Sequence, residues 1–101
     1  MAKNNLKSDI SENISKLSKL YALNPSKKLL NVMQDMFDAL QKAQAAEWAD
    51  GVQEYNDAKQ GLDAARKVAE KAIDDLKKTA DAIDKASKAI KLVLTAVAIL
   101  A

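Results

Sequence analysis

The residue types that most often carry out chemistry are scarce in this chain of 101 residues. It has no histidine and no cysteine, which removes thiol nucleophiles, disulfides, imidazole bases and nearly all zinc sites. Carboxylate pairs such as Asp74 with Asp75 and Asp81 with Asp84 could bind a metal or transfer protons, but each has lysines within one helical turn. We therefore expect solvated ion pairs, no enzymatic activity, no bound metal and no cofactor.

The charges are mixed along the chain. Sixteen basic residues face 14 acidic ones, and Arg66 is the only arginine. In the C-terminal half, acids stand four residues before lysines, as in Asp63 with Lys67, which is the favourable order on a helix. No nucleic-acid partner is expected, since that needs unopposed bases on one side. The N-terminal residues lack an apolar run, so no signal peptide is expected and we assign the chain to the cytoplasm by default, with signal-less secretion left open.

The elements that position these side chains are predicted to be helices. The chain is 49% apolar but only 4% aromatic, with 19 alanines, two glycines and one proline, a composition typical of long helices or coiled coils. We expect one all-α domain over residues 1–101, with helices at about 9–23, 25–49 and 52–100. It would form an elongated antiparallel helical hairpin or a three-helix bundle, with one long C-terminal helix and coiled-coil-like packing.

Local signals place the first two helices. Asp9 followed by Glu12 is a capping box that predicts a helix start, and Asn24 with Pro25 predicts both the end of that helix and the cap of the next. The second helix carries apolar residues on a broad face. We interpret Met33, Met36 and Phe37 as core residues, with an adaptable binding surface as the alternative.

A seven-residue repeat covers the C-terminal half of the chain. From Trp48 to Val97 every seventh residue is apolar, and a second column three residues later, from Gly51 onward, is almost entirely small. Such a pair of columns lets a neighbouring helix approach closely. The turn before the long helix is expected at Asp50-Gly51, with Asn56-Asp57 as the alternative.

Function is predicted from what this repeat leaves uncovered. We expect a non-enzymatic helical interaction module that contacts itself or another helical protein through the large column and its neighbours. The candidate interface residues are Trp48, Tyr55, Leu62, Leu76, Ile83, Ile90, Leu94 and Val97. The uncharged segment 92–101 is too short to span a bilayer. It is interpreted as an oligomer interface, with membrane contact or continuation in a longer chain as alternatives. The alternative function is a small secreted or membrane-active protein, such as a secretion substrate or filament subunit.

Two short resemblances bear on that alternative. A chain of about 100 residues with two helical arms and Trp48-Ala49-Asp50-Gly51 near the bend resembles the small Trp-x-Gly hairpin proteins exported by type VII secretion systems. The motif in this chain is one residue longer than the family's. The family's export signal has an acidic residue four positions after a tyrosine, and this chain has Lys59 at that place after Tyr55. Residues 23–26, Leu-Asn-Pro-Ser, are similar to the interhelical stretch of type III secretion needle subunits.

Overall fold

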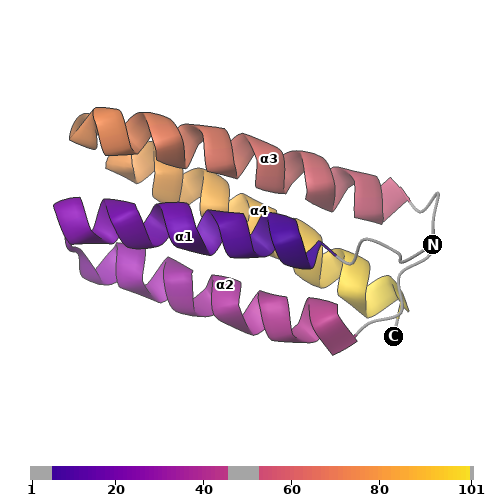
Figure 1. Cartoon of the computed structure of the whole chain (residues 1–101). Helices are drawn as coiled ribbons and strands as arrows, with labels where there is room; N and C mark the ends of the chain where they lie inside the picture. Colours follow the sequence, from indigo (N-terminus) through magenta and orange to yellow (C-terminus); the bar gives the residue numbers. More distant parts are fainter. Residues whose placement is uncertain (1–5, 46–52, 101) are drawn as a thin grey trace.

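A computed structural model describes residues 6–45 and 53–100, which form four helices around a common core (Figure 1). The helices are α1 (Lys7–Leu23), α2 (Lys27–Ala45), α3 (Gln53–Asp74) and α4 (Thr79–Leu100), with a short 3-10 helix η1 (Leu76–Lys78) before α4. No strand occurs in these two ranges. The all-α prediction is confirmed, and the architecture is a helical bundle 38 Å long and about 20 Å across.

Two antiparallel hairpins make up the bundle. One consists of α1 and α2 and the other of α3 and α4, and they pack with α1 beside α3 and α2 beside α4. Figure 1 shows that α1 and α3 run in one direction and α2 and α4 in the other. Each helix therefore has one antiparallel and one parallel neighbour, and α2 and α3 stand at opposite corners.

The single helix predicted over 52–100 is wrong, because the chain turns back after Asp74. Asp75 has an extended backbone, and its Oδ1 accepts a hydrogen bond from the main-chain nitrogen of Lys77 at 3.2 Å. The main-chain nitrogen of Lys78 then donates to the carbonyl oxygen of Asp75 at 3.0 Å. A continuous helix would leave its apolar columns in water, whereas folding back buries them against each other. The alternative turn at Asn56-Asp57 is also wrong, since both residues lie within α3, while Asp50-Gly51 lies outside the described residues.

The other helix ends differ from the predictions by a few residues. The first helix begins two residues before Asp9, after Leu6 in a left-handed conformation and with no side-chain cap. The second begins at Lys27 rather than at Pro25, and Ser26 Oγ, not Asn24, accepts from a main-chain nitrogen of its first turn, that of Leu29, at 3.1 Å.

The core consists largely of alanine where α3 meets α4. The small column of the repeat is buried throughout the described residues of both helices: Ala58, Ala65, Ala72, Thr79, Ala86 and Val93. At Gly61 an added Cβ would lie 2.7 Å from Leu92 Cδ1 and 3.8 Å from Ala89 Cβ. The two helices therefore approach closely at this glycine. Larger side chains from α1 and α2 complete the core, among them Leu17, Leu20 and Met36.

Candidate interaction surface

Most of the predicted interface residues lie inside the chain's own bundle. Leu62 and Ile90 are buried, while Tyr55, Ile83, Leu94 and Val97 are half-buried and pack against the core. Leu76, in the turn, is 42% exposed. Trp48 lies outside the described residues. The chain's own helices therefore cover Leu62 and Ile90.

The uncharged C-terminal segment also packs within the bundle. Val93 and Ala96 are fully buried, and Leu92 packs against the core. Ile99, by contrast, is 55% exposed. Among the described residues, none of the helices combines the length and the apolar character needed to cross a membrane.

Charged and polar side chains of α1 face α3. Arg66 of α3 donates to Asp63 and Glu70 at 2.8 Å each and lies 3.8 Å from Glu12 of α1. Lys16 of α1 lies 3.7 Å from Glu70. Hydrogen bonds from Arg66, and then from Lys67, lower the pKa of Asp63, while Asp63 and Glu70 raise the pKa of Arg66. This network joins the two hairpins at the surface, where each ion pair contributes little to stability.

A buried amide reinforces the same contact. Asn13 of α1 is 1% exposed, and its Nδ2 donates to the carbonyl oxygens of Asp9 at 2.9 Å and of Leu62, on α3, at 3.0 Å. Its Oδ1 has no hydrogen-bond partner. The hydrogen bond from Asn13 to α3 can form only when α1 and α3 are aligned in this way, so the buried amide favours a single register of the two helices.

The two turns are joined at one end of the bundle. Asn24 Nδ2, at the end of α1, donates to Thr79 Oγ1 at 3.1 Å, and that hydroxyl donates to the carbonyl oxygen of Leu76 at 2.7 Å. Thr79 is 8% exposed. The hydroxyl group of Thr79 therefore makes hydrogen bonds with residues of both hairpins.

Two open grooves on the other sides of the bundle are lined by mixed charges. The groove between α2 and α4 has Asp35, Asp38 and Lys91 beside Ile90 and Leu94. The groove between α3 and α4 has lysines and aspartates around Val68. Among the described residues, no cluster of three or more carboxylates could hold a metal ion.

The remaining side of the bundle carries large apolar side chains in contact with solvent. Phe37 is 50% exposed and Leu30 37% exposed, and Met33 and Leu40 are half-buried beside them. These four residues are spaced 3, 4 and 3 apart, so they form one line along α2. The core interpretation is confirmed for Met36, which is fully buried, and wrong for Phe37.

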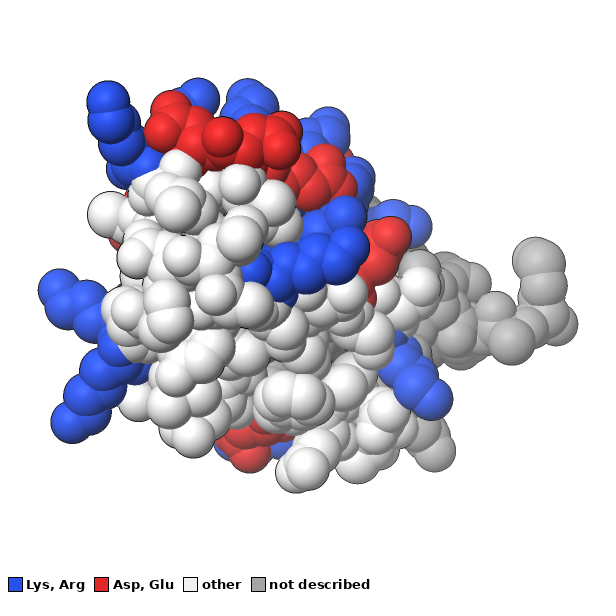
Figure 2. All heavy atoms as spheres, turned by 60° about the vertical axis from the view of Figure 1, so that its left-hand side comes forward, with Lys and Arg blue, Asp and Glu red and all other residues white. Residues whose placement is uncertain are grey.

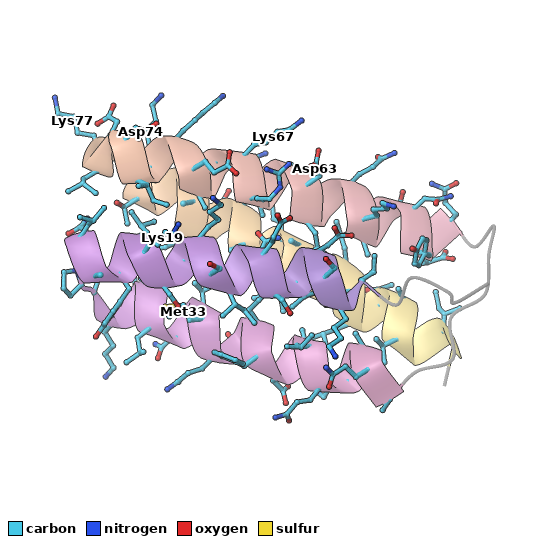
Figure 3. The ribbon with its side chains drawn as sticks, viewed as in Figure 1. Lys19, Met33, Asp63, Lys67, Asp74 and Lys77 are labelled. Carbon is cyan, nitrogen blue, oxygen red and sulfur yellow. The ribbon has the colours of Figure 1, made fainter. Side chains whose placement is uncertain are left out.

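Small uncharged residues of α1 border this line. Ser11, Ser15, Ser18 and Ala22 are exposed and follow each other at three or four residues, on the side of α1 opposite its contacts with α3. We call these four residues together with Leu30, Met33, Phe37 and Leu40 the α1–α2 face. Figure 3 shows Met33 on the side of α2 next to α1, with Lys19 directed towards α3.

Several charges of both helices lie off the centre of this face, and Lys7 stands at the end of its α1 line. Glu12 and Lys16 pair with α3, Asp35 borders the groove to α4, and Asp38 pairs with Lys42 at 3.1 Å. Figure 2, which is turned towards the end of the bundle with the two turns, shows a broad area without charged side chains, with red and blue side chains at its margins. Depletion of charge around an exposed phenylalanine and a partly exposed methionine is the composition that marks the centre of protein interfaces.

The signal for this face is present in the sequence. Residues 29, 32, 36, 39 and 43 are the core line of α2, and the line from Leu30 to Leu40 is a second one beside it. Together they cover roughly half of the helix circumference, which is wider than one bundle interior buries.

The fold defines the class of protein as an all-α four-helix bundle. Comparisons with protein family models, with curated proteins and with solved structures found no match to this chain.

Proposed function

We propose that the protein is a non-enzymatic helical interaction module and that its contact surface is the α1–α2 face. The observation that carries this proposal is the exposure of Phe37 and Leu30 on a side of the bundle away from the charges that pair with α3 or border the groove to α4. Burying half of a phenylalanine and a third of a leucine against a partner is favourable at about 25 cal/mol per Å2 of apolar area.

Two further features support a protein partner. Phenylalanine supplies a large contact area with little loss of side-chain entropy, and methionine adapts its shape to a neighbouring surface. The serines of α1 add little bulk, so a second helix can approach the backbone of α1 while Phe37 and Leu30 contact its side chains.

A cross-linking experiment in the source cells tests this function. A photoreactive phenylalanine analogue at position 37 should give protein cross-links, whereas the same analogue at Ala64, an exposed position of α3, should give few. The cross-linked proteins would be identified by mass spectrometry, with Leu30→Lys as a second variant expected to reduce the yield from position 37. Equal yields from positions 37 and 64, or no effect of Leu30→Lys, would contradict the proposal.

A further inference from the structure

We propose that the occupant of the α1–α2 face is a second copy of this chain, with the two α2 helices antiparallel across a two-fold axis near Asp35. This inference rests on the proposed function and adds the identity of the partner. It is carried by the symmetry of the exposed line, by its charge and by the room along it.

The line of apolar residues on α2 has the same spacing in both directions, with leucine at each end. Leu30 and Leu40 each lie five residues from position 35, and Met33 and Phe37 each lie two residues from it. In an antiparallel pair centred there, Leu30 faces Leu40 of the second copy and Met33 faces Phe37 of the second copy. A two-fold interface requires such self-complementarity, and methionine against an aromatic ring is a favourable contact.

The charges are compatible with a copy of the same surface. A charged surface would meet its own sign across a two-fold axis, which costs free energy. The residues that flank the apolar line on its outer side are Gln34 and Gln41, which are exposed and uncharged. At the rim, Asp38 already pairs with Lys42 of its own chain. No like charges are therefore brought together at the centre of the pair.

The long side of the bundle has room for a second copy. The bundle is 38 Å long, so α2 of a second copy can lie along α2 over the whole length of the apolar line. The exposed serines of α1 add little bulk next to it.

Single cysteines test both the pairing and its direction, because the chain has no cysteine of its own. Met33→Cys and Phe37→Cys proteins are mixed and oxidised. The mixed 33–37 disulfide should exceed either same-position product by about fivefold or more, because same-position pairs are offset by about 6 Å along the helix axis and a disulfide needs Cβ atoms about 4 Å apart. Ala64→Cys should give no faster dimer formation than a random encounter.

Sedimentation of the wild-type chain at micromolar concentration completes the test. A dimer that becomes a monomer in Phe37→Lys, with circular dichroism unchanged and with Ala64→Lys still dimeric, would support the proposal. A folded wild-type monomer, or a dimer whose cysteines cross-link 33 to 33 and 37 to 37, would overturn the antiparallel pair. If the wild type is a monomer but position 37 still cross-links other proteins in cells, the self-pairing fails and the proposed function stands. If neither occurs, both fail.

Discussion

Replacing Asn13 with aspartate tests how the buried amide holds α1 against α3. Nδ2 of Asn13 donates to two main-chain carbonyl oxygens at 2.9 and 3.0 Å, and the side chain is 1% exposed. Aspartate has nearly the same shape, but an oxygen takes the place of Nδ2. Three oxygens then meet at hydrogen-bond distance, and no donor lies between them when the carboxylate is ionised.

The magnitude follows from the contacts that are lost. Each missing hydrogen bond costs about 1 kcal/mol, and a buried charge without a partner raises the total to about 3 to 5 kcal/mol. We therefore expect Asn13→Asp to lower the free energy of unfolding by that amount at neutral pH. Asn31→Asp, the same change at an exposed position of α2, should stay within about 0.5 kcal/mol of the wild type.

The pH dependence gives a second measurement. Burial and the two carbonyl oxygens favour the protonated carboxyl, so its pKa is higher in the folded than in the unfolded chain. The loss of stability caused by ionisation is therefore absent below the pKa of the unfolded chain, about 3.9, and grows as the pH rises towards the pKa of the folded chain. Urea unfolding followed by circular dichroism should show a smaller gap to the wild type at about pH 4 than at neutral pH. A gap at neutral pH no larger than that of Asn31→Asp would refute this account of the buried amide.

Three further substitutions test other parts of the bundle by urea unfolding. Gly61→Val should lower the free energy of unfolding by about 1 to 3 kcal/mol, because an added Cβ meets a leucine methyl of α4 at 2.7 Å. Gly61→Ala makes the same contact but gains about 1 kcal/mol of helix propensity that offsets it. Equal stability of the two variants would contradict the close approach of α3 and α4. Arg66, and then Lys67, lower the pKa of Asp63 from its ordinary 3.8. The contribution of Asp63 to folding stability is therefore present above pH 3.8 and is lost as the pH falls through its pKa in the folded chain. Asp63→Asn should accordingly make the free energy of unfolding less sensitive to acid. Asp75→Ala should cost about 1 kcal/mol by removing the cap of the turn, and the same loss in Asp74→Ala would show that the cap is not its cause.

The helical class follows from composition and periodicity, but the number of helices does not. The seven-residue repeat passes through the turn without a break, because the four residues 75–78 occupy about one helical turn of the pattern. The small column is consequently buried both before the turn, at Ala72, and after it, at Ala86. Without glycine or proline, only the capping aspartate at position 75 marks the turn, and an aspartate among lysines is common in any exposed helix.

The proposed contact surface was not predicted from the sequence for a related reason. An apolar residue on an amphipathic helix is assigned to the core unless the width of the apolar arc is measured, and the line from Leu30 to Leu40 runs beside a true core line. Conversely, the seven-residue repeat is the most regular apolar pattern in the chain. Two of its members, Leu62 of α3 and Ile90 of α4, are buried in the core. Regularity thus indicated the interior, and the excess of apolar width indicated the candidate surface.

The hydrogen bond between Asn24 and Thr79 has a consequence for the order of folding. Within each hairpin the contacts join residues close together in the chain, and such contacts form fast. The contacts between hairpins span long stretches of chain, and they include two direction-dependent hydrogen bonds, Asn24 with Thr79 and Asn13 with Leu62. We expect the hairpins to form first and then to dock, with these two hydrogen bonds favouring one alignment of the two preformed halves.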